Sequence, residues 1–171
     1  KIVREFPRIP GIDFSGKVVE SNTEDFKKDE NVILTGCGVG ENFHGGYSQY
    51  AKVKKEFLVK TPKEITNKQA MILGTAGFTA LLCAFAIKAR EELLLGEKVN
   101  EVLVTGATGG VGSIAVMVLS KFGYKILGIE KSEFMLKKVV KSKNFECLQG
   151  DIRKIKIEKK FDCVISLFHV L

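Results

Sequence analysis

Residues that build metal sites and disulfide frameworks are scarce in this sequence. Its 171 residues include two histidines, four cysteines, three prolines and no tryptophan. No two cysteines form a C-x-x-C pair, so the ligand spacing of a zinc site is missing and we predict no metal. The wide spacing of the cysteines favours free thiols in a reducing compartment, and we therefore expect a cytoplasmic protein. The cysteines are Cys37, Cys83, Cys147 and Cys163.

The sequence also lacks arginine-rich tracts and alternating basic and aromatic residues, which argues against nucleic acid as a partner. The formal net charge is +7, from 27 basic and 20 acidic residues. Lysines spread along the chain supply most of the excess, as is typical of a solvated face, although a phosphorylated ligand is also compatible with it. Hydrophobic residues make up 45% and charged residues 27%, the mixture of a folded globular protein.

One apolar run is long enough to raise the question of a membrane span, because residues 70–87 contain no charged side chain. The segment Gly74-Thr75-Ala76-Gly77 interrupts the run, and each half then suits a helix in a protein core, so we predict no span. Thr66 and Gln69 have the spacing of a capping box, which predicts a helix start. An apolar stripe at helical spacing ends near Arg90 and consists of Phe78, Leu81, Leu82, Phe85, Ala86 and Ala89.

The period of the hydrophobic pattern divides the chain into two regions. Residues 1–62 have short strands between turns and glycine-rich loops, a pattern typical of a small barrel or sandwich. Strands are expected over residues 16–20, 31–35, 47–53 and 57–60.

Residues 63–171 alternate strands and helices after the first helix, which predicts a parallel sheet of the Rossmann type. The expected strands cover residues 101–105, 125–129, 146–148 and 161–167, and the expected helices cover 110–122 and 132–143. The last strand is apolar on both faces and belongs inside a covered sheet. Little sequence follows to cover it, and the chain begins without methionine, so we expect a fragment; a short protein with an edge strand is the alternative.

A glycine-rich loop gives the strongest chemical signal. Gly106, Gly109 and Gly112 follow the strand expected over 101–105 and open the next helix. The first glycine permits a sharp turn, the second a close approach to a pyrophosphate, and the third a close packing of helix and strand. The helix N-terminus adds free N–H groups. This arrangement predicts a dinucleotide site, with a purely structural turn as the alternative.

The end of the second strand distinguishes NAD from NADP in such folds. An acidic residue there accepts a hydrogen bond from the ribose 2′-hydroxyl of NAD, whereas basic residues bind the 2′-phosphate of NADP. Here Glu130 favours NAD, and Lys131 and Ser132 favour NADP. The residues alone leave both cofactors open.

Five short segments match the motifs of one family in order and spacing. They are residues 6–16, 34–42, 45–50, 73–80 and 104–112. The chain resembles the medium-chain dehydrogenase/reductase superfamily on its quinone oxidoreductase side, and more narrowly the acryloyl-CoA reductase subfamily. The resemblance implies an α/β fold: a partial GroES-like β-barrel over 1–62, then a partial Rossmann parallel sheet with flanking helices over 63–171. It also implies NADPH as cofactor, no zinc, and a homodimer.

The resemblance assigns the cofactor residues singly. Thr79 matches a threonine that opens a helix near the nicotinamide, with helix capping as its alternative role. Glu130, Lys131 and Ser132 occupy the 2′-phosphate loop, where Glu130 departs from the small residue usual in the subfamily. The residues expected at the pyrophosphate are Gly106, Thr108, Gly109, Gly110, Val111 and Gly112.

The catalytic residues stay unassigned. Asn42, His44 and Tyr47 lie on a loop that the resemblance places at the cleft, where His44 is either a proton donor or a solvated side chain. The implied reaction is reduction of the C=C bond of an α,β-unsaturated carbonyl, with acryloyl-CoA as a candidate substrate. The enolate formed needs hydrogen-bond donors. A quinone reductase and a catalytically idle NADPH-binding relative are the alternatives, and an isolated fragment is expected to be inactive.

Overall fold

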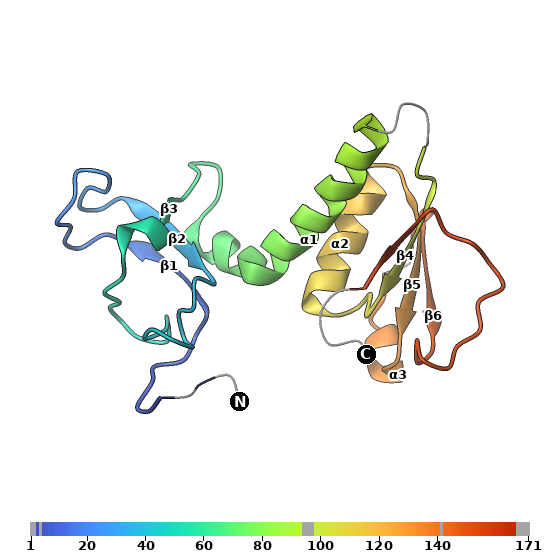
Figure 1. Cartoon of the computed structure of the whole chain (residues 1–171), viewed down its shortest axis with the longest axis horizontal. Coiled ribbons are helices and arrows are strands. Elements are labelled where there is room, and N and C mark those ends of the chain that lie inside the picture. Colours follow the sequence, from blue (N-terminus) through green and yellow to red (C-terminus); the bar gives the residue numbers. More distant parts are fainter. Residues whose placement is uncertain (1–2, 4, 94–97, 141, 167–171) are drawn as a thin grey trace. The chain divides into compact units, whose positions relative to one another are not determined.

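The computed structural model describes residue 3 and residues 5–93, 98–140 and 142–166. The chain divides into two compact units, Lys1–Thr75 and Ala76–Leu171 (Figure 1). The first unit holds an antiparallel sheet and the second a parallel sheet with helices, so the predicted fold class is confirmed. The division falls inside a helix, and the domain boundary expected between residues 62 and 63 stays a prediction.

The first unit is built on a sheet with the strand order β1-β2-β3. Its elements are β1 (Asp13–Lys17), β2 (Asn31–Thr35), the short 3-10 helix η1 (Lys55–Phe57) and β3 (Val59–Lys60). Val32 and Leu34 of β2 are buried, because every second residue of a strand lies on the same face. The strand expected over 31–35 is confirmed, the one over 16–20 begins three residues earlier, and the one over 57–60 is reduced to two residues.

The strand expected over residues 47–53 is absent among the described residues of this unit. The chain here pairs instead with the turn at residues 9–11. The N–H of Gly46 donates to the carbonyl of Gly11 at 3.0 Å, and the N–H of Tyr47 donates to the carbonyl of Pro10 at 3.0 Å. Tyr47 and Tyr50 are exposed, so their alternation with polar residues does not reflect a buried sheet face.

Helix α1 (Asn67–Leu93) begins and breaks where the sequence predicts. Gln69 accepts a hydrogen bond from the N–H of Thr66 (2.8 Å), and the Thr66 hydroxyl accepts one from the N–H of Gln69 (3.2 Å), which completes the capping box. Gly74 has φ +48° and ψ −153°, a backbone conformation that residues other than glycine scarcely adopt. The predicted interruption of the apolar run is therefore confirmed.

Asp13 of β1 supports this break. Its carboxylate accepts hydrogen bonds from the N–H of Thr75 (2.8 Å) and from the Thr75 hydroxyl (2.5 Å). A Cβ at Gly74 would lie 2.8 Å from Oδ2 of the same carboxylate. The carboxylate thus satisfies donors that the interrupted helix leaves free.

The apolar stripe expected on α1 does not form its buried face. Phe78, Leu82 and Phe85 are each 56% exposed, whereas Ala80, Ala84 and Ile87 are buried. Ala84 and Ile87 join the core of the second unit. The small side chain of Ala84 lets the helix backbone approach the sheet closely, and Ile87 fills the space beside it. By length and mean hydropathy (2.1) α1 would suffice to cross a membrane, and the absence of a span stays a prediction.

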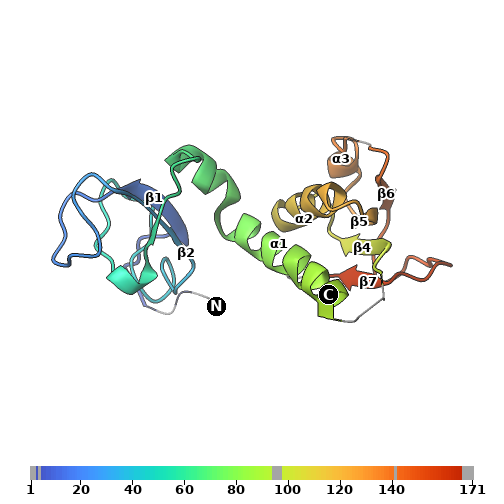
Figure 2. The ribbon, with the colours of Figure 1, turned by 90° about the horizontal axis from the view of Figure 1, so that it is seen from above.

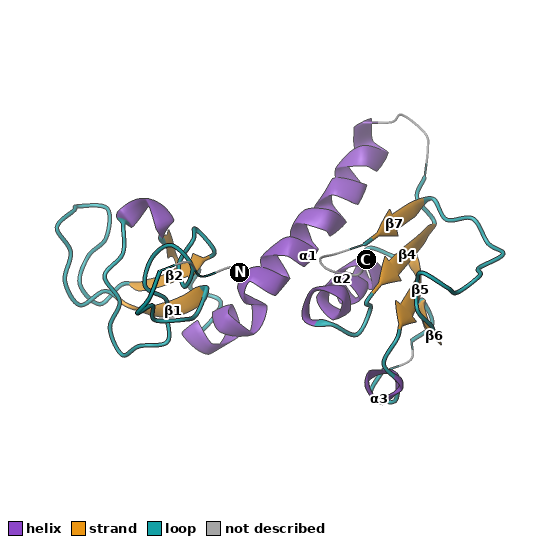
Figure 3. Ribbon diagram, turned by 60° about the horizontal axis from the view of Figure 1, so that its bottom comes forward, coloured by secondary structure: helices purple, strands orange, loops and turns teal. Residues whose placement is uncertain are grey.

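The second unit contains a four-stranded parallel sheet with the order β6-β5-β4-β7 (Figure 3). Its core lies between the sheet and one layer of helices, with α1 and α2 on the same side (Figure 1) and α3 beside β5 and β6 (Figure 2). The elements are β4 (Glu101–Thr105), α2 (Gly110–Lys121), β5 (Lys125–Glu130), α3 (Glu133–Leu136), β6 (Phe145–Gln149) and β7 (Cys163–Ile165).

Two elements of this unit are shorter than predicted. The helix expected over 132–143 ends at Leu136. Val139 and Val140 are β-branched and lysines repeat around them, so the sequence favours helix only weakly after the first turn. The strand expected over 161–167 covers Cys163–Ile165, and Leu167 lies outside the described residues.

Glu91 ties the end of α1 to the sheet. Its carboxylate accepts hydrogen bonds from the hydroxyl of Tyr124 and from the N–H of Val99 at 2.9 Å. Tyr124 is buried in the core cluster. The hydrogen bond from Tyr124 holds the pKa of Glu91 below its ordinary value.

We expect Gly74→Ala to lower the free energy of unfolding by about 1–3 kcal/mol, because alanine is strained at this φ and its Cβ meets the Asp13 carboxylate. Urea denaturation measures the change. Gly16→Ala is the control, since a Cβ at Gly16 meets no atom within 4 Å. Equal stability of the two variants would contradict the strain at Gly74.

We expect Tyr124→Phe to lower the free energy of unfolding by about 1 kcal/mol at pH 7, because one hydrogen bond to a carboxylate is lost. A lowered pKa in the folded state adds stability above the unfolded pKa and loses it as pH falls through the folded pKa. The difference between the two proteins should therefore shrink below pH ~4. Urea denaturation at neutral and acidic pH tests this, with the exposed Tyr50→Phe as control. A difference independent of pH would refute it.

Candidate functional site: a glycine loop at the end of a parallel strand

The glycine loop leaves β4 and enters α2 by a turn that requires glycine. Gly106 follows the buried Thr105 and has φ +58°, in the left-handed region. A Cβ at Gly112 would lie 2.2 Å from the carbonyl oxygen of Gly106, and one at Gly109 would lie 3.3 Å from it. Any larger residue at position 112 would therefore push the helix away from the strand.

The same loop presents main-chain N–H groups at the start of α2. Gly109 is the N-cap of α2, and the N–H of Ser113 makes the first helical hydrogen bond, to the carbonyl of Gly109 (2.9 Å). The N–H groups of Gly110, Val111 and Gly112 precede it and have no helical acceptor. These residues fit a pyrophosphate, because bare N–H groups at a helix start are donors for phosphate oxygens.

Thr108 connects the loop to the end of β5. Its hydroxyl donates to one carboxylate oxygen of Glu130, and the N–H of Ser132 donates to the other at 2.7 Å. Burial alone would raise the pKa of Glu130, but these hydrogen bonds outweigh burial and hold the pKa below its ordinary value. Glu130 is thus ionised, and it holds the glycine loop and the following turn together.

Lys131, the residue after Glu130, lies close to other charged side chains at this end of the parallel sheet. Lys131 Nζ lies 3.2 Å from Oδ2 of Asp151, which follows β6 and also binds Arg153. Asp151 and Arg153 are absent from the cofactor residues predicted from the sequence. The expected strand over 146–148 was the available signal, since the ends of neighbouring parallel strands meet at one edge.

Thr79 lies on the part of α1 that belongs to the second unit. It is half-buried, one helical turn after Ala76. The Cβ of Ala76 lies 3.6 Å from the position of a Cβ on Gly110. The start of this part of α1 therefore contacts the glycine loop, and the structure brings Thr79 to the same end of the unit as the other expected cofactor residues. Their role in binding stays a prediction.

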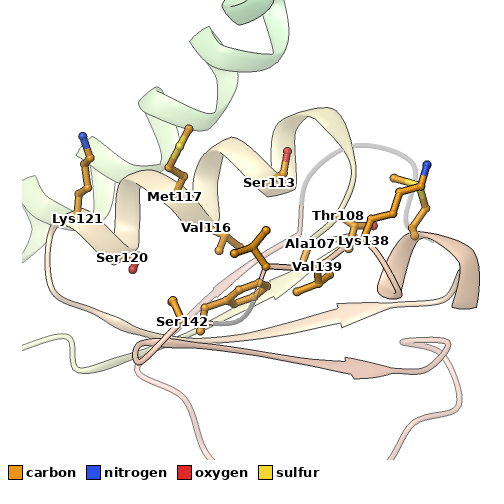
Figure 4. Close-up of a pocket in the computed structure, with 13 residues that line it drawn as sticks. Ala107, Thr108, Ser113, Val116, Met117, Ser120, Lys121, Lys138, Val139 and Ser142 are labelled. Atoms are coloured by element: carbon orange, nitrogen blue, oxygen red, sulfur yellow. The ribbon is translucent and has the colours of Figure 1, made fainter.

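A cavity of about 560 Å³ lies between α2 and the segment that follows α3 (Figure 4). Thr108 reaches its wall, but Gly109–Gly112 and Glu130–Ser132 do not line it. Its walls are mainly apolar, from residues such as Val116, Met117 and Val139, so its chemistry does not suit phosphate. It borders the segment where the expected helix ends early.

Cysteine and histidine chemistry in the described residues is simple. All four cysteines are free thiols. Burial, with the charge of Glu130, raises the pKa of Cys147 to about 11. The described residues contain no group of three His, Cys, Asp or Glu side chains placed to hold a metal ion, and the absence of a metal stays a prediction.

The loop with Asn42, His44 and Tyr47 belongs to the first unit. His44 is exposed, and its Nδ1 accepts a hydrogen bond from the N–H of Ile9 at 3.2 Å. This contact gives His44 a structural role beside the turn at residues 9–11. Its role as a proton donor stays a prediction.

The sequence of this chain is similar to those of known proteins. Residues 1–63 match the alcohol dehydrogenase GroES-like domain family. A protein of Ruegeria pomeroyi named acrylyl-CoA reductase AcuI is 47% identical over 128 residues, which are 75% of this chain and 38% of that protein. This chain spans about 40% of the length of the curated relatives that it matches.

Two solved structures are similar at the level of fold and sequence. The yhdH oxidoreductase from Salmonella enterica in complex with NADP has a TM-score of 0.76 and 43% identity, over 85% of this chain and 45% of that chain. The Bacillus subtilis protein yhfP with NAD bound has a TM-score of 0.74 and 39% identity, over 85% of this chain and 44% of that chain. The resemblance seen in the motifs is confirmed: the chain belongs to the medium-chain dehydrogenase/reductase superfamily, in its quinone oxidoreductase-like branch.

Proposed function

We propose that this protein is a zinc-independent, NADPH-dependent oxidoreductase that reduces the C=C bond of an α,β-unsaturated carbonyl, with acryloyl-CoA as the candidate substrate. The observation that carries the proposal is the open glycine loop between β4 and α2, where a Cβ at Gly112 would meet the carbonyl of Gly106. The name of the Ruegeria pomeroyi relative and the NADP bound to the Salmonella enterica relative support it.

The residues of the chain would hold the cofactor from several directions. The N–H groups of Gly110, Val111 and Gly112 would receive the pyrophosphate, and Thr79 would lie toward the nicotinamide. Once bound, the reduced nicotinamide supplies the hydride that adds to the β-carbon of the acceptor. The chain contributes binding, orientation and exclusion of water around that transfer.

NADPH is the proposed cofactor rather than NADH, although NAD is found in the Bacillus subtilis relative. Glu130, the residue that favours NAD, already accepts hydrogen bonds at both carboxylate oxygens. Lys131 at the same edge has a side chain that is 72% exposed and carries the charge that a 2′-phosphate requires.

The surroundings of the protein complete the proposal. We propose a cytoplasmic homodimer that acts on a small molecule and binds neither nucleic acid nor membrane. The free thiols support a reducing compartment, and the dimer follows from the family resemblance.

Gly112→Ala should weaken NADPH binding by at least about tenfold, because the added methyl group separates the loop from the helix that supplies its N–H donors. Isothermal titration calorimetry measures the dissociation constant, and thermal unfolding checks the fold. Gly16→Ala carries the same change at an open site and should bind as the parent protein does. Unchanged affinity in a folded Gly112→Ala protein would show that the loop is a structural turn.

The reaction itself is tested with the full-length protein by NADPH oxidation, followed at 340 nm, with acryloyl-CoA and with 1,4-benzoquinone in parallel. We expect oxidation with acryloyl-CoA and formation of propionyl-CoA in equal amount. Oxidation with the quinone alone would assign quinone reduction instead. Binding of NADPH without its consumption by either acceptor would assign the catalytically idle role, and either result overturns the proposed substrate.

A further inference from the structure

We propose that Arg153 forms the 2′-phosphate subsite together with Lys131, and that the carboxylate of Asp151 occupies this pair of cations when no phosphate is bound. Asp151 would thereby limit the preference of the protein for NADPH over NADH. The inference deepens the proposed function and rests on it.

The two cations meet at one oxygen atom. Lys131 Nζ lies 3.2 Å from Oδ2 of Asp151, and Nη2 of Arg153 contacts the same oxygen. Nε of Arg153 donates to Oδ1 at 2.9 Å, so the guanidinium binds both carboxylate oxygens. Phosphate oxygens are bound by the same fork of donors and by the same ammonium group. The geometry is that of an anion site in which a side chain supplies the anion.

Strand pairing brings these residues together from distant parts of the sequence. Glu130 at the end of β5 pairs with Gln149 at the end of β6, and the N–H of Gly150 donates to the carbonyl of Glu130 at 2.9 Å. Lys131 and Asp151 therefore leave the sheet side by side. This is the edge where the glycine loop also lies, because Thr108 is hydrogen-bonded to Glu130.

Lys131 and Arg153 are exposed, so a phosphate can reach them, whereas Asp151 is largely buried. The Arg153 side chain is 56% exposed, whereas the Asp151 side chain is 17% exposed. The hydrogen bonds from Arg153, with that from Lys131, hold the pKa of Asp151 well below its usual range, so Asp151 is a carboxylate at neutral pH. Both cations remain accessible from solvent while the carboxylate beneath them neutralises part of their charge.

The local charges predict how substitutions act. Lys131 and Arg153 are matched by the two carboxylates of Asp151 and Glu130, so an incoming 2′-phosphate meets a cluster without net charge. Removing the charge of Asp151 makes the cluster positive, and removing Arg153 makes it negative. Only a ligand that carries the extra phosphate responds strongly to either change, because an uncharged ribose hydroxyl has little Coulomb interaction with them.

Asp151 also has a local role that needs no ligand. Its Oδ1 accepts a hydrogen bond from the N–H of Arg153 at 3.1 Å, which closes a turn after β6. Asparagine keeps this acceptor and loses the charge. Asp151→Asn therefore separates the role in the turn from the role as counter-ion.

The test is isothermal titration calorimetry of NADPH and NADH with the parent protein, Arg153→Ala and Asp151→Asn. Arg153→Ala should weaken NADPH binding about tenfold and change NADH binding less than about twofold. Asp151→Asn should strengthen NADPH binding several-fold and leave NADH binding unchanged. Lys160→Ala, which removes a positive charge from an exposed residue of the same unit, should alter neither.

The outcomes separate the inference from the proposed function. Equal effects of Arg153→Ala on both nucleotides, or no effect on either, would overturn the subsite. An unchanged preference in Asp151→Asn would overturn the counter-ion role. A parent protein that binds neither nucleotide would contradict the proposed function itself. Thermal unfolding checks each variant, and if Arg153→Ala does not fold, Arg153→Lys replaces it, with a smaller loss of NADPH affinity expected because the charge remains while the fork is lost.

Discussion

The close approach of strand β4 to helix α2 is the constraint on which the rest of the second unit depends. The carbonyl of Gly106 lies where the Cβ of any larger residue at position 112 would be. This contact lets α2 start immediately beside the sheet end, so that its first N–H groups and the ends of β5 and β6 belong to one surface. The Thr108 hydroxyl then donates a hydrogen bond to Glu130, so the glycine loop before α2 is connected to the end of β5.

Acidic side chains have a repeated structural role in this protein. Asp13 satisfies donors at the break in α1, Glu91 holds the end of the same helix, and Glu130 closes the glycine loop. In each case a carboxylate binds donors that irregular backbone or a buried hydroxyl leaves free. At Glu91 and Glu130 the donors stabilise the ionised form and hold the pKa below its ordinary value, since hydrogen bonds to a carboxylate are stronger than those to its neutral acid. In this basic chain, the main effect of these acidic residues is therefore on the local geometry of the backbone and not on the net charge.

The sequence predicted those features that one stretch of chain encodes by itself. The capping box at Thr66, the break at Gly74 and the strand over 101–105 depend on neighbouring residues, and all three are confirmed. Features that depend on packing partners were predicted less well. The stripe with Phe78 and Phe85 has helical spacing, but spacing does not reveal which face meets the sheet, and small residues pack there instead. The pairing of Lys131 with Asp151 and Arg153 depends on the register of two strands, which no local pattern encodes.

The raised pKa of Cys147 bears on the chemistry of the proposed substrate. An α,β-unsaturated thioester is an electrophile that alkylates sulfur anions, and a protein that handles one exposes its own cysteines to that damage. A thiol whose pKa is about 11 is almost wholly protonated at neutral pH, and the protonated form is a poor nucleophile. Burial beside the charge of Glu130 thus keeps the sulfur of Cys147 in the form that reacts slowly with an α,β-unsaturated thioester, should the proposed substrate bind.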